Sequence, residues 1–310
     1  MLAFLCPGQG SQAPGFMTPW LESPSYAERM RYFSDFIGVD LVEHGTVSDA
    51  DTIRDTAIAQ PLIVAASMAS FFELWDDPKS FIPTNFAVAG HSVGEFAAAA
   101  IANVLSPKTA IEWVNFRAQA MAKAAASTSG SMAAVLGGDA IEVTAAIEAA
   151  GATAANINGA GQIVAAGPTS AIESLVANPP AGTRVVQLQV AGAFHSSQMQ
   201  PAVAELTAQI DIDGGLVTDP TSTLFTNFDG SVVSSGTEFC NLMVGQIANS
   251  VRWDLCMQAM IASGVTAVIE LSPAGTLAGL AKRGMPGVEI LALKTPDQID
   301  AAKELIAKHI

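Results

Sequence analysis

The sequence predicts an α/β fold in which a smaller subdomain is inserted into a larger one. Near the N-terminus, short apolar runs of strand length alternate with longer helical stretches, an order typical of a parallel sheet covered by helices. Between residues 131 and 190 the predicted order changes to β-α-β-β-α-β, which is typical of a ferredoxin-like unit. A glycine-bounded serine turn joins one N-terminal strand to its helix. We therefore expect the active site on the parallel sheet, beside the inserted unit.

The composition describes a folded chain without a membrane span. Of the 310 residues, 50% are hydrophobic and 14% are charged, and the longest apolar stretches are broken by Gly, Ser or a charge. Met1 leads straight into a strand-like segment with no basic region, so we expect a cytoplasmic protein without a secretory signal. A net charge of -15 argues against nucleic acid or an anionic membrane as a partner. The three cysteines have no metal-like spacing and fit structural thiols in a reducing compartment.

The first predicted strand, Leu2–Cys6, runs into a glycine-rich loop. This loop, PGQGSQ at 7–12, leaves backbone and amide donors exposed at the end of the strand, and it is not a P-loop because no Lys-Ser/Thr pair ends it. A helix is predicted from Gln60 to Trp75, a strand from Phe86 to Ala89, and an Ala-rich helix from Gly94.

The turn between the last two elements, GHSVG at 90–94, has the G-x-S-x-G pattern of a nucleophile elbow. Its two glycines allow strand and helix to pack closely around a strained serine whose hydroxyl stands clear of the sheet. Ser92 is therefore the candidate nucleophile. A plain Gly/Ser turn is the alternative, which the flanking strand and helix disfavour.

The next predicted helix carries an arginine on its apolar face. Ser106 and Pro107 form its capping signal. On a 3.6-residue wheel, Arg117 lies among alanines and larger apolar residues. Arginine is rarely buried without an anion, so Arg117 pairs either with a protein carboxylate or with a ligand. The residues alone favour the internal ion pair.

The inserted unit is assigned to residues 127–192, and the larger subdomain to 1–126 and 193–310. Small polar residues before Gly130 mark the crossing between them. The turn of its central hairpin is predicted at Asn158-Gly159, where Asn158 would overhang the site. Its strands are predicted at 131–136, 153–157, 162–166 and 183–190, and its helices at 139–150 and 169–177.

A second site residue lies in the loop 191–196, where the chain returns to the larger subdomain. Among the four histidines, only His195 combines a loop position with a place after the candidate nucleophile, while His91 is expected to be held in the elbow and turned away. Nearly all acids between Ser92 and His195 lie on predicted helices, which favours a Ser-His dyad without a carboxylate. We expect this base to titrate near neutral pH.

The rest of the chain continues the α/β pattern. We predict a hairpin around Asp229-Gly230, helices at 237–248, 254–263 and 274–283, strands at 265–271 and 288–293, and a last helix from Pro296. The helix at 274–283 carries the one adjacent basic pair of the sequence, Lys282-Arg283.

Short motifs stand in order along nearly the whole chain: PGQGSQ near the start, AQPLIVAA at 59–66, GHSVGE, FRAQAM around Arg117, GSMAAVLG at 130–137, NINGAGQIVAAGP at 156–168, GAFHSSQM, and NSVRW ending at Trp253. Together they resemble the malonyl-CoA:acyl carrier protein transacylases of bacterial fatty acid and polyketide synthesis. Several ordered motifs are far more specific than one G-x-S-x-G. The resemblance implies a hydrolase-like α/β core with a parallel sheet, a ferredoxin-like insertion, and a site in the cleft between them.

The resemblance also implies roles for five residues in catalysis. Ser92 is the acylated nucleophile and His195 its base. The backbone N–H groups of Gln9 and Val93 form the oxyanion hole. The backbone carbonyl of Gln246 orients His195 in place of a triad acid.

Substrate binding follows from the same resemblance. Arg117 would bind the free carboxylate of malonate, which reverses the preference for an internal ion pair, and Gln9 and Asn158 would also contact the substrate. Phe194, before His195, resembles the malonyl-selecting members of the polyketide branch. Where the family often has Asn-Pro, this chain has Asn249-Ser250, so the entry to the following helix is expected to differ.

The implied activity is transfer of a malonyl group from coenzyme A to the pantetheine thiol of acyl carrier protein through a malonyl-serine. Malonyl-CoA and acyl carrier protein are the expected partners, the expected assembly is a monomer, and no metal or other cofactor is expected, because the CoA thioester and the carrier's pantetheine arrive as substrates. Two alternatives stay open: a serine thioesterase or esterase, and a carrier-docking subunit without catalysis.

Overall fold

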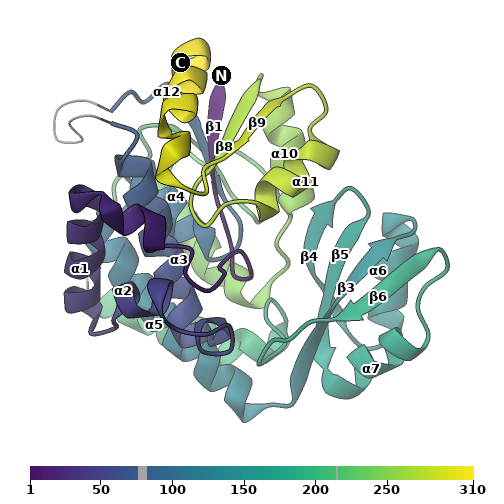
Figure 1. The fold of residues 1–310 in the computed structure, drawn as a ribbon. Coiled ribbons are helices and arrows are strands. Elements are labelled where there is room, and N and C mark those ends of the chain that lie inside the picture. The colour runs from purple at the N-terminus through teal and green to yellow at the C-terminus, as the bar shows by residue number, and fades with distance from the viewer. Residues whose placement is uncertain (76–81, 214–215) are drawn as a thin grey trace.

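The computed structural model describes residues 1–75, 82–213 and 216–310, which form two sheets with their helices (Figure 1). The larger sheet has the strand order β7-β2-β1-β8-β9 and is parallel throughout. Its strands are β1 (Leu2–Cys6), β2 (Ala87–Gly90), β7 (Thr223–Phe225), β8 (Ala267–Glu270) and β9 (Glu289–Ala292). The predicted α/β fold with a parallel sheet is confirmed.

Both faces of this sheet are covered, because successive side chains of a strand point to opposite sides. On one face, Leu2 and Phe4 of β1 pack against the helices that precede and follow the elbow. On the other face, Ala3 and Leu5 pack against the helices near the C-terminus. The helices of this part are η1 (Thr18–Glu22), α1 (Pro24–Ile37), α2 (Leu41–Thr46), η2 (Thr52–Arg54), α3 (Thr56–Phe72), α4 (Gly94–Ile101), α5 (Pro107–Ser127), η3 (Ser197–Met199), α8 (Gln200–Asp213), α9 (Gly236–Gly245), η4 (Gln246–Ala248), α10 (Trp253–Ala262), α11 (Thr276–Gly284), η5 (Pro296–Gln298) and α12 (Ile299–His309).

Helix starts agree with the capping chemistry where the sequence carries it. The α5 helix begins at Pro107, with the Ser106 hydroxyl accepting from the Thr109 N–H at 3.0 Å, as predicted. The α3 helix begins four residues before the predicted Gln60, because the Asp55 carboxylate caps it by accepting from the Ala57 N–H at 2.8 Å. No helix of the described chain is long and apolar enough to cross a membrane.

The smaller sheet is antiparallel, with the order β4-β5-β3-β6. Its elements are β3 (Gly130–Gly137), α6 (Ala140–Ala149), β4 (Thr153–Gly159), β5 (Gln162–Pro168), α7 (Thr169–Ala177) and β6 (Thr183–Gln187), which is the predicted ferredoxin-like succession. The limits 127 and 192 stay a prediction. The hairpin turn predicted at Asn158-Gly159 is wrong: β4 continues through Gly159, and Ala160-Gly161 turn the chain with φ of 48° and 73°.

The smaller sheet is attached to the larger subdomain along β4, the strand nearest the core in Figure 1. The Val251 N–H donates to Ala155 O at 2.8 Å, and the Ile157 N–H donates to Val251 O at 2.9 Å. The Ser250 hydroxyl adds a hydrogen bond to Ala154 O at 2.7 Å, which a proline at this position does not make. The departure from the Asn-Pro pattern therefore ties the helix entry to the smaller sheet.

The chain reverses around Asp229-Gly230, as predicted. Phe225 and Val232 form an antiparallel bridge, and the Thr226 N–H donates to Ser231 O at 3.0 Å and the Val233 N–H to Leu224 O at 2.9 Å, so the second arm of this hairpin is short. Its first strand, β7, also pairs in parallel with β2. The remaining helices and strands occur where the sequence predicts them, within a few residues at their ends.

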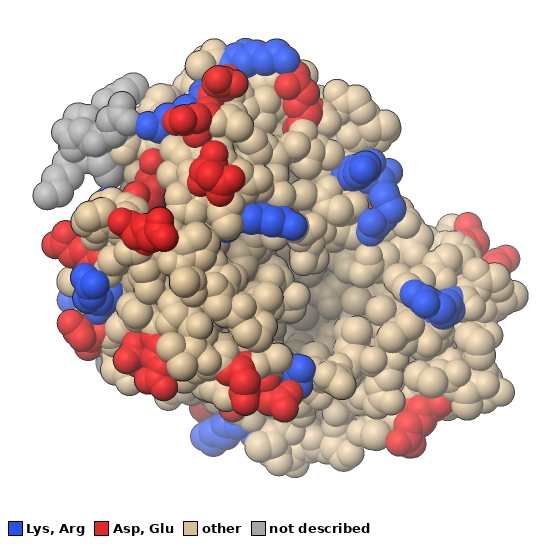
Figure 2. All heavy atoms as spheres, viewed as in Figure 1, with Lys and Arg blue, Asp and Glu red and all other residues tan. Residues whose placement is uncertain are grey.

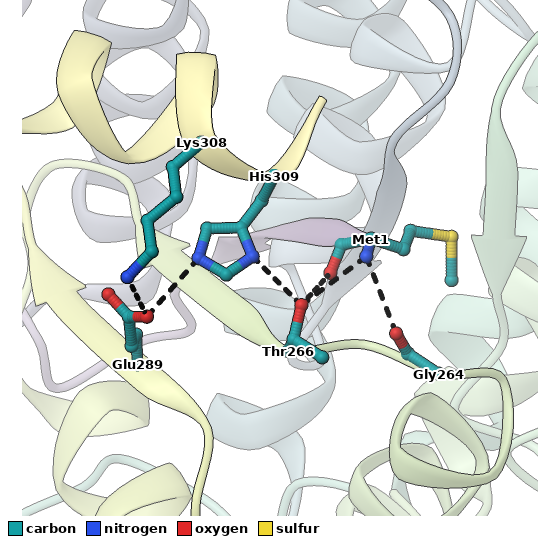
Figure 3. A network of polar contacts seen from close by, with 6 residues as sticks. All are labelled: Met1, Gly264, Thr266, Glu289, Lys308 and His309. Atoms are coloured by element: carbon teal, nitrogen blue, oxygen red, sulfur yellow. Dashed lines mark hydrogen bonds and ion pairs between the residues drawn. The ribbon is translucent and has the colours of Figure 1, made fainter.

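The two chain ends meet at the outer end of the large sheet (Figures 1 and 3). The Met1 ammonium donates to Gly264 O and to the Thr266 hydroxyl, both at 3.4 Å. His309 of α12 contacts the same hydroxyl through Nδ1 at 2.8 Å. Lys308 pairs with Glu289 of β9. Polar contacts thus join β1, β8, β9 and α12 far from the elbow.

Candidate active site

Ser92 occupies a strained turn between β2 and α4. Its φ of 52° lies in the left-handed region, where a side chain is disfavoured. The flanking glycines are required by packing: a Cβ at Gly90 would lie 2.1 Å from the Gly94 carbonyl carbon, and one at Gly94 would lie 2.1 Å from Cys6 O. The geometry is therefore that of a nucleophile elbow, as the sequence predicts.

His195 faces this hydroxyl. Its Nε2 lies 2.7 Å from Ser92 Oγ, and its Nδ1 lies 2.8 Å from the backbone carbonyl of Gln246. A carbonyl only accepts, so Nδ1 carries the proton and Nε2 is free to accept the serine proton. The Ser92 hydroxyl, the His195 ring and the Gln246 carbonyl, which the resemblance assigns to catalysis, are in contact with one another through His195. The backbone carbonyl of Gln246 takes the position that a carboxylate has in a catalytic triad.

Burial, and after it the charge of Arg117, lowers the pKa of His195 from 6.5 to about 3. The expected titration near neutral pH is therefore wrong for the substrate-free protein. His195 is neutral across the physiological range, which is the state of a general base.

Arg117 points from the buried face of α5 toward the serine and is 1% exposed. It donates to Gln60 Oε1 at 2.7 Å, to Gln246 Oε1 at 3.2 Å and to Ser92 Oγ at 3.3 Å. Within the described chain its Nε has no partner, and no carboxylate lies within 4.0 Å of its nitrogens. The internal ion pair favoured by the residues alone is therefore wrong.

Gln9 and Val93, whose backbone N–H groups the resemblance assigns to the oxyanion hole, both line the cavity together with Ser92. Neither the Gln9 N–H nor the Val93 N–H donates to a protein acceptor in the parts of the chain that the structure describes. The Gln9 side chain is held by Arg54 O at 3.2 Å and by the Thr56 hydroxyl at 3.4 Å. Val93 directly precedes α4, whose N-terminus favours negative charge.

These groups open into a cavity of about 300 Å³ between the two subdomains, which Figure 2 shows as a hollow at the centre of the face. Its lining comes from the large subdomain, including α11, and from the smaller sheet. The apolar part of the wall consists of Val93, Met121, Met132, Val164, Leu188, Val190, Phe194, Leu277 and Leu280.

Phe194 and Asn158 both line the cavity, and their contact with a substrate stays a prediction. Phe194 lines the cavity next to the base. Asn158 is part of the wall on β4 and does not overhang it, because its side chain is 6% exposed and its Oδ1 lies 2.9 Å from His91 Nε2. His91 also lines the cavity, but its ring contacts Asn158 and lies 5.5 Å from that of Trp253, so it faces these residues and not the Ser92 hydroxyl.

Sequence reasoning missed three residues that hold this site. Gln60 accepts from Arg117, and Asn227 joins the elbow by accepting from the Ser92 N–H and donating to Gly90 O, both at 2.7 Å. The buried Glu95 carboxylate accepts from the Asn227 N–H at 2.7 Å and from the Gln246 amide. Gln60 and Glu95 lie inside the motifs AQPLIVAA and GHSVGE, a signal that was available, whereas Asn227 lies in no motif.

The profile of the acyl transferase domain matches residues 3–302 of the chain. The chain belongs to this acyl transferase family. A Mycobacterium tuberculosis protein named malonyl CoA-acyl carrier protein transacylase is 44% identical over 306 residues, which cover 98% of this chain and 100% of the relative. An Escherichia coli protein of the same name is 31% identical, over 98% and 99%.

Solved structures agree with the fold. The crystal structure of MCAT from Mycobacterium tuberculosis superposes with a TM-score of 0.90 at 42% identity, covering 98% of this chain and 99% of that one. An acyl-carrier-protein S-malonyltransferase from Burkholderia pseudomallei superposes with a TM-score of 0.89 at 32% identity, with the same coverage. The recognised family and the two-subdomain fold are confirmed.

Proposed function

We propose that this acyl transferase moves a malonyl group from coenzyme A to the pantetheine thiol of acyl carrier protein. The observation that carries the proposal is the position of Arg117, a buried cation with an unpartnered Nε whose guanidinium lies 3.3 Å from Ser92 Oγ. A buried cation beside the nucleophile suits an acyl group that ends in a carboxylate. The relatives that cover the whole chain are named for malonyl transfer.

The first half-reaction acylates the serine. His195 Nε2 accepts the Ser92 proton while Oγ attacks the thioester carbonyl carbon. The N–H groups of Gln9 and Val93 stabilise the oxyanion. The C–S bond then breaks, and the CoA thiolate leaves and takes the proton from His195.

The second half-reaction repeats these steps with another thiol. The pantetheine thiol of the carrier gives its proton to His195, and its sulfur attacks the malonyl-serine carbonyl. Collapse of the oxyanion releases Ser92, which regains its proton from the histidine. No metal or additional cofactor takes part, since both thiols arrive with the substrates.

Specificity rests on the far end of the acyl group. The free carboxylate of a malonyl ester lies two bonds from the carbonyl carbon, within reach of Arg117. Phe194 closes the wall beside His195 and limits the volume at the α-carbon, and Gln9 and Asn158 contact the bound thioester. Acetyl groups lack the carboxylate and would leave a buried guanidinium unpaired.

A serine thioesterase uses the same elbow with water as the acceptor. The two activities separate in one assay: release of CoA from malonyl-CoA is followed with and without the pantetheine-bearing carrier protein. Transfer predicts one stoichiometric burst of CoA without carrier and steady turnover with it. Steady turnover without carrier would establish the thioesterase, and no burst in either case would establish a docking subunit without catalysis.

A further inference from the structure

The mechanism above makes no use of Glu95, a carboxylate buried directly beneath the elbow. Glu95 lies in the first turn of α4 and is 1% exposed. Burial acts to raise the pKa of this carboxyl, while the Asn227 N–H and the positive charge of Arg117 act to lower it, and both of its oxygens accept from N–H donors, as an ionised carboxylate does. Burying a carboxylate costs free energy unless hydrogen bonds compensate for the lost water, so the contacts of Glu95 are of interest.

Both oxygens of Glu95 accept hydrogen bonds from segments that are distant in the sequence. Oε1 accepts from the Asn227 N–H at 2.7 Å, and Oε2 accepts from the side-chain amide of Gln246. These two donors come from the turn after β7 and from η4, so one carboxylate joins three elements under the nucleophile.

The contact with Glu95 determines which way the Gln246 amide faces. Its nitrogen lies among three acceptors, namely Glu95 Oε2, Asn227 Oδ1 at 3.0 Å and Ser92 O at 3.3 Å. Its oxygen therefore points the other way, 3.2 Å from the NH2 nitrogen of Arg117. An amide fixed in this orientation offers the guanidinium an acceptor.

We propose that Glu95 is a positioning residue for substrate selection, which fixes the Gln246 amide so that its oxygen holds the Arg117 guanidinium over Ser92. The inference rests on the proposed malonyl transfer and deepens it. The guanidinium and the carboxylate share no direct ion pair, and one amide stands between them. Arg117 is thus held by neutral acceptors and keeps its charge for the substrate carboxylate.

Glu95→Gln tests this with little change of volume. A glutamine at this position accepts from the Asn227 N–H through its oxygen, so its –NH2 faces the –NH2 of Gln246. If Gln246 turns over, its donor faces Arg117, and its oxygen meets Ser92 O and Asn227 Oδ1. Either arrangement removes a hydrogen bond that holds the guanidinium.

The measured quantity is kcat/KM for malonyl-CoA divided by kcat/KM for acetyl-CoA. We expect Glu95→Gln to lower this ratio by roughly tenfold, the worth of one hydrogen bond to a charged group, with acetyl transfer retained. The matched control is Glu270→Gln. Glu270 is also buried and accepts from three backbone N–H groups of the α11 start, at 2.7 to 2.8 Å, without a contact to Arg117. It should lower the melting temperature and leave the ratio unchanged.

A second variant breaks the same contact from the other end. Gln246→Met removes the amide, keeps the volume and keeps the backbone carbonyl that faces His195. It should lower the ratio by a similar factor. Because both changes break one contact, the double variant should lose no more than either single variant.

Three results would overturn the inference: a wild-type ratio in folded Glu95→Gln, equal loss for both thioesters, or additive losses in the double variant. If Glu95→Gln does not fold, Gln246→Met alone decides, and an unchanged ratio in it rejects the proposal. A wild-type protein without preference for malonyl-CoA would instead overturn the proposed function, and with it this inference.

Discussion

The protein contains two polar networks of similar chemistry in opposite surroundings. The elbow network joins Ser92 and His195, which line the cavity, to Arg117, Gln246 and Glu95, which are buried behind its lining. In the network of the chain ends (Figure 3), the side chains of the Lys-Glu pair are 61% and 46% exposed, whereas that of His309 is 11% exposed. Each contains a histidine, a cation and a carboxylate.

Burial makes the difference between them. In the exposed network the lysine and glutamate pair directly, and water screens the pair, so it adds little to stability. In the elbow network desolvation is the largest influence on each ionisable group: it raises the pKa of Glu95 and lowers those of Arg117 and His195. The comparison shows that burial shifts the pKa values of the ionisable groups next to the nucleophile, as catalysis requires.

Ser92→Ala should break the elbow network's function completely. No acyl-enzyme should form, because among the residues that the structure describes no other hydroxyl lies within hydrogen-bonding distance of the base. Intact mass after incubation with malonyl-CoA measures the adduct. Ser196→Ala is the control, since the Ser196 hydroxyl is buried next to the base but donates to Ala193 O at 2.7 Å, and this variant should still be labelled. A malonyl adduct on Ser92→Ala would move the nucleophile elsewhere.

His195→Ala should slow acylation by about 10² to 10⁴, the worth of a positioned general base. The wild-type pH profile follows from the lowered pKa: protonation, which blocks the base, sets in only toward pH 3, so the rate should show no inflection near 6.5. Rapid-quench acylation between pH 5 and 8 measures this.

The matched control for His195→Ala is His44→Ala on α2, outside the cavity, with an unchanged rate expected. An unchanged rate in His195→Ala would make His195 structural. An inflection near 6.5 that vanishes in His195→Ala would show that His195 is solvated and outside the buried network.

A smaller effect on the transfer reaction is expected from the exposed basic residues that would contact the carrier protein. Lys282 and Arg283 end α11, whose side chains line the cavity, and Figure 2 shows basic side chains around the hollow. Reversing both to Glu should raise KM for the carrier protein several-fold if these cations contact it, and leave KM for malonyl-CoA nearly unchanged. Lys308→Glu at the chain ends is the control and should change neither. Equal effects on both substrates would indicate general destabilisation.

The smallest effect is expected in the exposed network itself. Lys308→Ala removes the ion pair with Glu289, and because water screens that pair, the melting temperature should fall by less than about 2 °C, and by less still in high salt. Malonyl transfer should not change. Thermal unfolding at two salt concentrations measures it, and a large, salt-independent loss would contradict the contrast between the networks.

Local chemistry made much of the fold predictable. The start of α5 follows from the Ser106-Pro107 cap, and the ferredoxin-like succession follows from pattern and turn residues. The hairpin turn was misplaced because Asn158-Gly159 is a favoured turn pair, while the structure turns at Ala160-Gly161 and uses Asn158 to contact His91. No element was assigned to residues 13–55, where α1 and α2 bury only narrow apolar stripes.

The residues of the site also differ in how far the local sequence predicts them. Ser92 is predictable because five consecutive residues, 90–94, form the pattern of its turn. The partners of Arg117 are not, since an apolar helix face reveals burial but not which groups face it. Glu95 and Asn227 are 132 residues apart and meet only through the tertiary fold. The roles of Gln9, Val93 and Phe194 stay predictions drawn from the resemblance.

The most direct test of the account is the preference for malonyl-CoA over acetyl-CoA in Arg117→Ala. A bidentate pair of guanidinium and carboxylate contributes at least about 1.5 to 3 kcal/mol, so kcat/KM for malonyl-CoA should fall by roughly tenfold to several hundredfold. Transfer of acetyl should hold or rise, because the substitution removes a buried cation that no carboxylate of an acetyl group can pair with. Arg117→Lys should restore only part of the loss, since an ammonium lacks the planar fork. Equal loss for both thioesters, together with a lower melting temperature, would contradict the account and make Arg117 a structural residue.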